Sequence, residues 1–452
     1  MAAAVDGSDG TVAVWGAFDL DSFGDQLYPR ITEDEIVRRL PGWTVRTYAP
    51  LGWERPCRSD GGFVAEPLGE RTEKRIAQLA AAADVTLVST GIRADVSPWF
   101  VDGLGAAWER AHPVIWNAVG VEAGSEQIRD ALAARRHISV RDEVSAQRLR
   151  DCGVSNDITV VPDLGVLVHR LIRAESLRPR VDYFRLMGWY PIDRPALIVQ
   201  GDQAAVPHVK EIARILRWTL AEVLIADVVI LETSESGFAD LLAEHLDPNH
   251  TYRLPFGLPP EDVLAAIHGS IGTVATDYHA TLSSAMLGRR WALLDTTDDH
   301  AELASMLEEP THRATSTEEL AEAIRIAFPK QPDPHRYAPL RDKVDTHFDT
   351  IAQEAERSWI KNGGNSEHRW ADVRRENAQL RAAYRASRLQ LAAERRQLLE
   401  HIQLAANGTG LAAIPAEEIA KLRADSAELA RLQQTKLIRW SSPARRIYGK
   451  LK

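Results

Sequence analysis

The sequence has little of what marks a secreted or membrane-spanning protein. Only two cysteines occur among its 452 residues, Cys57 and Cys152, and neither lies in a CxxC pattern, so no disulfide framework or structural zinc site is indicated. No apolar run approaches the roughly 20 residues that span a bilayer. The start, MAAAVDGSDG, lacks the basic and apolar regions of a signal peptide. We therefore expect a cytoplasmic protein.

The sequence also has fewer basic than acidic residues. The formal net charge is −10 at pH 7, from 54 Lys and Arg against 64 Asp and Glu. Because binding to nucleic-acid phosphates requires a basic face, we expect no nucleic-acid partner. The exception is the stretch 429–452, which holds seven basic residues and no acidic one.

What the chain does contain is a repeated alternation of short β-branched runs and helical patterns. In the first part, such runs lie at residues 12–15, 45–48, 85–89, 114–117, 138–140 and 158–161. A second set lies at residues 196–200, 227–231, 251–254, 271–275 and 291–294. This alternation predicts βαβ units and parallel sheets. The expected fold class is α/β, with two Rossmann-like domains facing a cleft in a GT-B-like arrangement.

The same patterns predict four segments. Residues 1–177 form an N-terminal Rossmann-like domain, in which the first helix covers 32–40. Residues 178–194 form a crossing linker, because their prolines disfavour a regular element. Residues 195–361 form a second Rossmann-like domain with a return helix, and 362–452 form a helical, coiled-coil-like tail with a basic end.

The tail has two features with open interpretations. After the Asn-Gly-Gly-Asn-Ser break at 362–366, residues step by three and four as in a heptad seam: Trp370, Val373, Asn377, Leu380, Tyr384, Ser387, Leu391, Glu394, Leu398, His401 and Ala405. Several of these are polar, so a homodimer through residues 370–405 and a loosely packed hairpin both remain open. The end mixes basic and aromatic residues, which indicates either peripheral contact with the inner membrane face or a solvated basic terminus.

Three polar segments follow predicted strands, where ligands of parallel sheets bind. The first contains Gly24 and Asp25 in a loop after the first strand. A glycine there lets backbone N–H groups approach an anion. The sequence has no GxGxxG or Walker A motif, so a tight turn capped by Asp25 is an equal alternative.

The second segment places Arg141 at the carboxyl end of a strand, and Asp142 or Glu143 begins the next helix. A guanidinium group can bind a carboxylate or phosphate through two parallel hydrogen bonds. The alternative is that Arg141 pairs with Asp142 or Asp163 and braces the loop.

The third segment, residues 271–288, places His279 at the start of a helix. An imidazole there can give or take a proton near neutral pH. In the alternative interpretation, Thr276 or Asp277 caps the helix while His279 is packed and inert.

Taken in order, these segments resemble the polysaccharide pyruvyl transferase family over about residues 11–330. The matching residues are Gly24-Asp25, Val140-Arg141-Asp142-Glu143, Gly153, Val160-Val161-Pro162-Asp163 and His279. The resemblance implies that a pyruvyl group moves from phosphoenolpyruvate, a donor substrate, to a sugar hydroxyl of a cell-envelope glycan or glycolipid. It implies that Arg141 binds the donor and that His279 is the general acid, with neither a cofactor nor a metal.

The substrate-binding residues expected from this resemblance are Gly24, Asp25, Asp163, Asp277 and His300. Two of them differ from the family pattern. Asp277 stands where members usually have Arg, two residues before the histidine, and His300 lies near the position at which members commonly carry Lys. A pyruvyl transferase therefore needs replacement cations, for which the sequence offers Arg93, Arg289 and Arg290. A nucleotide-sugar glycosyltransferase on the same fold and a non-catalytic binding or scaffold module remain alternatives.

Overall fold

The computed structural model describes much of the chain up to residue 361. The described residues are 10–16, 23–48, 79, 81–89, 114–121, 126–132, 137–172, 174–222, 226–233, 236–296, 300–330, 332–333 and 335–361. The chain divides into two units, residues 1–373 and 374–452, and all of the second lies outside this description. The predictions for the heptad seam, the basic end and Arg93 therefore fall outside the described residues.

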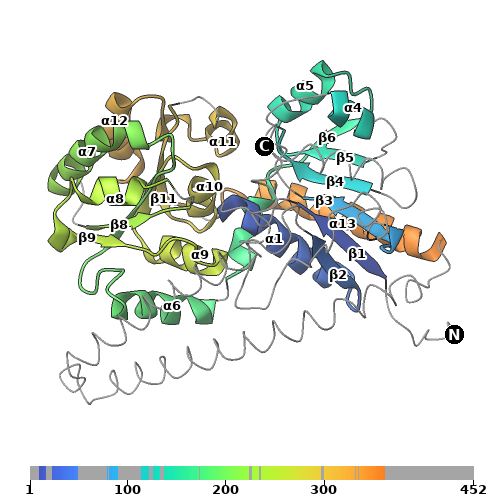
Figure 1. The fold of residues 1–452 in the computed structure, drawn as a ribbon, viewed down its shortest axis with the longest axis horizontal. Helices are drawn as coiled ribbons and strands as arrows, with labels where there is room; N and C mark the ends of the chain where they lie inside the picture. The colour runs from blue at the N-terminus through green and yellow to red at the C-terminus, as the bar shows by residue number, and fades with distance from the viewer. Residues whose placement is uncertain are drawn as a thin grey trace, which may run out of the picture. The chain divides into compact units, whose positions relative to one another are not determined.

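The first half of the described chain forms a parallel sheet with the strand order β2-β1-β3-β4-β5-β6 (Figure 1). Its strands are β1 (Thr11–Trp15), β2 (Thr44–Tyr48), β3 (Val85–Val88), β4 (Val114–Val119), β5 (His137–Val140) and β6 (Ile158–Val160). Its helices are α1 (Phe23–Arg39), α4 (Glu126–Leu132), α5 (Glu143–Asp151) and the 3₁₀ helix η1 (Leu164–Arg170). The central strands are buried on both faces, as expected of a parallel sheet covered by helices.

A second parallel sheet follows, with the order β12-β11-β10-β7-β8-β9. Its strands are β7 (Ala196–Gln200), β8 (Asp227–Leu231), β9 (Thr251–Arg253), β10 (Gly272–Ala275), β11 (Arg290–Leu294) and β12 (Arg313–Ala314). The accompanying helices are α6 (Ala174–Leu186), η2 (Val206–His208), α7 (Val209–Glu222), α8 (Phe238–Ala243), η3 (Pro248–His250), α9 (Pro260–Gly269), α10 (Tyr278–Met286), α11 (Ala301–Met306), η4 (Pro310–His312) and α12 (Thr317–Ala327). The predicted α/β class with two Rossmann-like sheets is confirmed.

Helix α1 corrects one prediction from the sequence. Gly24 and Asp25 do not form a loop ahead of the helix, because α1 begins at Phe23. Phe23, Leu27 and Ile31 recur every four residues and are all buried, so packing stabilises the extra turns despite the glycine. Asp25 thereby lies in the first turn, where its charge suits the helix dipole.

Helix α6 corrects a second prediction, because residues assigned to an irregular crossing linker form its regular turns. Pro179 lies within this helix and its side chain is exposed, so the ring does not collide with the core. Val181 and Phe184 on the other side of α6 are buried, and α6 packs against α9. Tertiary packing here outweighs the unfavourable effect of proline in a helix.

Helix α13 (Ala338–Lys361) follows the second sheet in sequence and packs on the first, against α1, η1 and β3 (Figure 1, orange). Asp345 anchors it: Oδ2 accepts from Arg170 Nη2 at 2.6 Å and Oδ1 accepts from Arg39 Nη2 at 2.8 Å. Glu35 is buried on the α1 side and accepts from Arg170 Nη1 at 2.9 Å. The cluster joins α1, η1 and α13, so the predicted return helix is held by part-buried ion pairs as well as apolar contacts.

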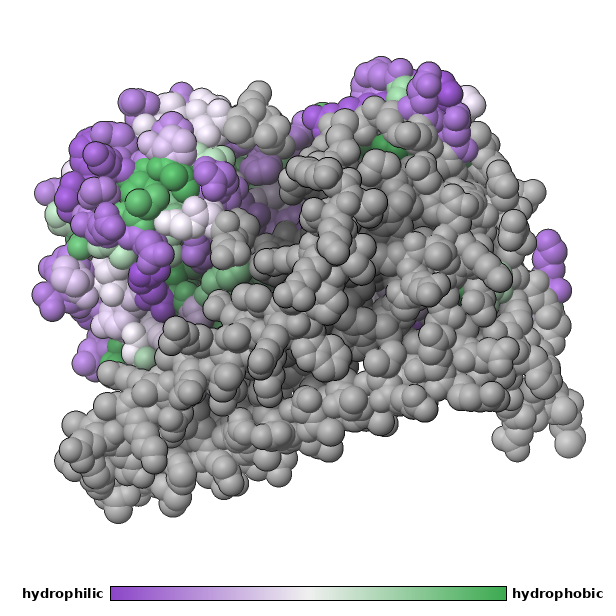
Figure 2. Space-filling model, in the orientation of Figure 1, coloured by the Kyte–Doolittle hydropathy of each residue, from purple (hydrophilic) through white to green (hydrophobic). Residues whose placement is uncertain are grey.

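Figure 2 shows hydrophilic side chains over much of the second sheet's helices, with a hydrophobic patch over α7 and α8. Leu241 of α8 is one of the exposed large apolar side chains. Among the residues with described positions, no helix is both long and apolar enough to cross a membrane.

Candidate functional site

The site is built around His279, where α1 and η1 of the first half contact α10 of the second. Helix α10 starts at this point because the chain leaving β10 is held in place. Gln200 Oε1 accepts from the backbone amides of Thr276 at 3.1 Å and Asp277 at 2.9 Å. Asp277 Oδ1 then caps the helix by accepting from the amide of Ala280 at 2.7 Å. His279 consequently stands in the first turn.

A chain of two hydrogen bonds holds the His279 imidazole. Tyr28 Oη donates to Asp163 Oδ2 at 2.7 Å and lies 2.9 Å from His279 Nε2. Because a phenol has one proton and here gives it to the carboxylate, its oxygen accepts from Nε2–H. Asp163 Oδ2 itself is 3.7 Å from Nε2, too far for a direct hydrogen bond.

The electrostatics of this chain favour a charged imidazole. Burial acts against protonation of His279, but the Asp163 carboxylate and, more weakly, Asp277 outweigh it and raise its pKa. Burial likewise acts against ionisation of Asp163, yet His279, Arg141 and the Tyr28 hydroxyl lower its pKa. Burial and the adjacent Asp163 raise the pKa of Tyr28, so the phenol stays neutral. An imidazolium beside a carboxylate is the state that these residues stabilise.

Arg141 enters the same site from the end of β5. Its Nε donates to Asp142 Oδ2 at 3.0 Å, and its Nη1 lies 3.9 Å from Asp163 Oδ2. The guanidinium carbon sits 4.7 Å from the ring centroid of Tyr278, within range of a cation–π interaction. Burial works to lower the pKa of Arg141, but the surrounding oxygens of Tyr28, Tyr278 and the two aspartates raise it well above its ordinary value.

Two glycines make room for these side chains. A Cβ on Gly24 would lie 2.1 Å from His279 Nδ1, and a Cβ on Gly120 would lie 2.7 Å from Arg141 Cζ. Both distances are far below a van der Waals contact, so neither position accommodates another residue without displacing the imidazole or the guanidinium.

His300 borders the site through Tyr278. The two rings meet edge to face with centroids 5.8 Å apart, and the His300 amide donates to Asp295 Oδ2 at 3.0 Å. Its Nδ1 is buried and has no hydrogen-bond partner among the described residues. A ligand oxygen at this point would satisfy that nitrogen.

Residues 83–298 match the model of the polysaccharide pyruvyl transferase family. The resemblance predicted from the sequence is thereby confirmed over a region that contains Arg141, Asp163 and His279. The sequence matches no curated protein. Helix α1, with Gly24 and Tyr28, precedes the matched region.

Solved structures resemble this chain in fold. The UDP-GlcNAc 2-epimerase from Methanocaldococcus jannaschii aligns with 12% identity and a TM-score of 0.50, covering 74% of this chain and 98% of the epimerase. Another UDP-N-acetylglucosamine 2-epimerase aligns with 12% identity and a TM-score of 0.51, covering 80% and 98%. At such identities the likeness concerns the fold alone, which is of the GT-B type.

The structure thus brings together Gly24, Arg141, Asp163 and His279, with His300 at the border. Asp277 serves as the helix cap, and Asp25 lies next to Gly24 on α1. Of the replacement cations proposed from sequence, the two with described positions lie elsewhere: Arg289 is close to His268, and Arg290 donates to the backbone oxygen of Lys330.

Sequence reasoning missed the two tyrosines of the site. Tyr278 adjoins His279 in sequence, and Tyr28 lies one helical turn after Gly24, a relationship that becomes visible once α1 is extended back to Phe23. No group of three or more His, Cys, Asp or Glu that could hold a metal ion occurs among the residues searched, which are the described ones.

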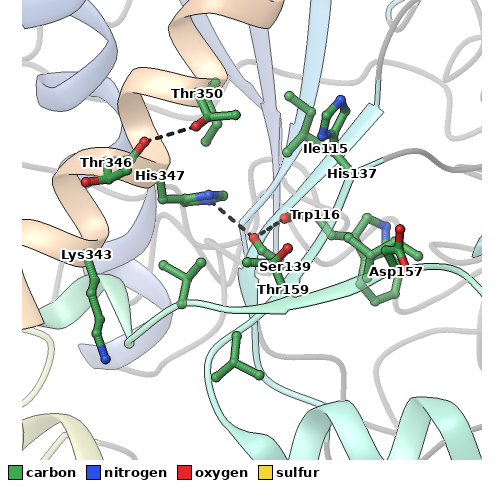
Figure 3. A pocket seen from close by; sticks show the side chains of 14 residues that line it. Ile115, Trp116, His137, Ser139, Asp157, Thr159, Lys343, Thr346, His347 and Thr350 are labelled. Carbon is green, nitrogen blue, oxygen red and sulfur yellow. Dashed lines mark hydrogen bonds between the residues drawn. The ribbon is translucent and has the colours of Figure 1, made fainter.

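A separate cavity of about 390 Å³ lies between strands β4 to β6 and helix α13 (Figure 3). His347 Nε2 projects from α13 to Asn117 Oδ1 at 2.9 Å and to Ser139 Oγ at 3.2 Å. The Ser139 hydroxyl donates to the Trp116 carbonyl, so His347 does not take its proton as a base would. We therefore regard this pair as part of the attachment of α13 rather than as a nucleophile and base.

Proposed function

We propose that this protein transfers the pyruvyl unit of phosphoenolpyruvate to a sugar hydroxyl of a cell-envelope glycan, with His279 as the general acid. The observation that carries the proposal is the His279–Tyr28–Asp163 chain beside Arg141. It favours the protonated imidazole beside a part-buried guanidinium, and protonation of an anionic enol donor requires such an acid.

In the proposed step, a His279 N–H bond breaks as a C–H bond forms at the methylene carbon of the donor. The carbon that carries the phosphate becomes electrophilic, and a sugar hydroxyl adds to it and releases its proton. A second hydroxyl then displaces inorganic phosphate, gives its proton to the departing phosphate and closes a ketal. Arg141 would bind the donor carboxylate or phosphate. The Nδ1 of His300, which has no hydrogen-bond partner among the described residues, would give a further hydrogen bond to it.

Carboxylates near Arg141 and His279 oppose the binding of an anionic donor. Arg141 already interacts with Asp142 and Asp163, and Asp277 stands near His279 in place of a cation. The hydrogen bonds that Asp163 and Asp277 accept, from Tyr28 and from the start of α10, disperse part of their charge. We propose that His279 in its charged form and His300 compensate for the missing Arg and Lys.

Donor binding can be tested without knowing the acceptor. Calorimetry should detect phosphoenolpyruvate binding to the full chain, and phosphate release should appear when an acceptor glycan is added. His279→Gln should bind the donor more weakly and release no phosphate, whereas His335→Gln, which changes an exposed histidine outside the site, should behave as wild type. Absence of both donor binding and phosphate release would refute the proposal.

A second candidate is an enzyme that uses a nucleotide sugar. Asp277 in place of Arg favours it, because an aspartate there disfavours a trianionic donor. The two solved structures compared above are described as UDP-GlcNAc 2-epimerases. Thermal-shift measurements with phosphoenolpyruvate and a panel of nucleotide sugars separate the two. Stabilisation by a nucleotide sugar alone would favour the second candidate, and no stabilisation by any compound would favour a non-catalytic relative.

A further inference from the structure

We propose that Tyr28 is the positioning residue of His279: it holds the Nε2–H of the imidazole and leaves Nδ1 as the nitrogen that exchanges a proton with a ligand. The hydrogen bonding of Tyr28 is a property of the folded chain by itself. Its part in proton delivery rests on the function proposed above.

The first argument is the direction of the hydrogen bonds. Asp163 Oδ1 accepts from the amide of Gly165 at 2.7 Å, which fixes the carboxylate and leaves Oδ2 facing Tyr28. With the phenol proton committed to Oδ2, the phenol oxygen can only accept from His279. Nε2 must therefore carry a proton in both the neutral and the charged imidazole.

The second argument is the distance between Asp163 and His279, which only the Tyr28 hydroxyl bridges. The 3.7 Å between Asp163 Oδ2 and His279 Nε2 leaves no direct hydrogen bond, so the phenol oxygen is the bridge between them. The rings of Tyr28 and His279 stand nearly perpendicular, at 89° with centroids 5.5 Å apart, which also restrains rotation of the imidazole.

The third argument concerns the remaining nitrogen. Nε2 faces a phenol that is buried in α1, and the His279 side chain as a whole retains 13% exposure. Nδ1 lies on the other side of the ring against Gly24, at the N-terminal end of α1. Because Nε2 is occupied, exchange with a ligand falls to Nδ1.

The groups facing His279 come from four elements, and their effects on its protonation differ in sign. Tyr28 on α1 contacts Nε2 through its phenol oxygen. Asp163 at the start of η1 and Asp277 at the cap of α10 favour the imidazolium. Arg141 at the end of β5 opposes it. Tyr278 lies next to the ring with centroids 5.0 Å apart and stays neutral, because burial and Asp163 raise its pKa. Removal of the Tyr28 hydroxyl therefore removes one favourable contact and leaves the opposing guanidinium.

The experiment is nitrogen-15 NMR of the full chain with labelled histidine. Among the 14 histidines, the signals of His279 are assigned by their loss in His279→Gln. In wild type we expect the neutral form to carry its proton on Nε2. In Tyr28→Phe we expect a mixture of tautomers and a pKa for His279 lower by about 1, since a hydrogen bond to the charged form is lost.

The matched control is Tyr190→Phe, which removes another buried phenol hydroxyl, one that donates to the Ala266 carbonyl at 3.0 Å. This variant should leave the His279 signals unchanged. Wild-type His279 protonated on Nδ1, or unchanged tautomer and titration in Tyr28→Phe, would overturn the proposal. The wild-type measurement is decisive even if Tyr28→Phe does not fold.

The role in proton delivery has its own readout. If the proposed function holds, the alkaline limb of kcat/KM for phosphoenolpyruvate should move to lower pH in Tyr28→Phe by the same amount as the His279 titration. A shifted titration with no turnover in any variant or wild type would reject the proposed function and leave the positioning by Tyr28 intact. A shifted titration with an unshifted profile would reject the role in delivery.

Discussion

The imidazole of His279 occupies the space that a side chain at position 24 would need, with Nδ1 2.1 Å from the place of a Cβ on Gly24. Gly24 belongs to α1 of the first half and His279 to α10 of the second. The contact therefore links the first turns of two helices that are far apart in sequence. The His279 ring can lie at this place only because residue 24 has no side chain.

Replacement of Gly24 by alanine should displace the His279 ring and lengthen its contact with Tyr28. We expect a loss of stability of about 1–3 kcal/mol, typical of an added methyl in a packed site, and a large loss of phosphoenolpyruvate turnover. Urea unfolding and phosphate release measure the two effects. Val37→Ala, a truncation on the exposed side of the same helix at 47% exposure, is the control and should change neither by much. Full turnover in Gly24→Ala would show that the ring need not lie where the structure places it.

Arg141 should not be replaceable by lysine. A lysine ammonium cannot donate to Asp142, reach Asp163 and stack on Tyr278 at once, as the guanidinium does. We expect Arg141→Lys to weaken phosphoenolpyruvate binding about tenfold or more, since a charge-assisted bidentate contact is lost. Calorimetry measures the change, with Arg150→Lys on the exposed face of α5 as the control. Unchanged affinity would mean that Arg141 only braces the loop.

Hydrophobic periodicity and capping residues in the sequence predict most of the fold, because buried strands such as β1 and capped helices such as α5 are specified locally. Asp142, for example, caps α5 through the amide of Ser145 at 2.6 Å. The failures are non-local. Helix α1 is held by burial of Phe23 and α6 by packing on α9, which outweigh the local effects of Gly24 and Pro179. The site follows the same division: motifs indicate Arg141 and His279, but Tyr28 joins them only through tertiary contacts.

Stability should fall in mild acid because of His347. Burial and the nearby His137 lower the pKa of His347 to about 4. The unfolded chain takes up a proton at this histidine near pH 6.5, while the folded chain does not. The free energy of unfolding is therefore unaffected by protonation of His347 above that pH and decreases as the pH falls towards 4. The shift corresponds to at most about 3 kcal/mol. Urea unfolding between pH 7 and pH 4.5 should show a shallower decline in His347→Gln, and an equal decline in both proteins would contradict this assignment.

A second histidine, His169, should contribute to the same decline, since burial and the adjacent Arg341 and Arg170 lower its pKa to about 4. His279 acts in the opposite sense. Its pKa is raised, so its contribution is full below the unfolded pKa and is lost as the pH rises through the folded value. In His279→Gln the decline in stability towards acid should therefore be steeper than in wild type.

Attachment of α13 to the first sheet should depend on Asp345. This carboxylate accepts hydrogen bonds from Arg38, Arg39 and Arg170, which lower its pKa although burial opposes them. Asp345→Asn leaves the arginines with less compensation, and we expect a loss of about 2–4 kcal/mol in unfolding free energy, as for a part-buried ion pair with one partner removed. Asp342→Asn changes an exposed carboxylate on the same helix and is the control. Limited proteolysis should cleave α13 faster in Asp345→Asn alone, since the cluster attaches this helix to α1 and η1. Equal cleavage of the two variants would mean that apolar contacts such as those of Val344 and Phe348 suffice to hold it.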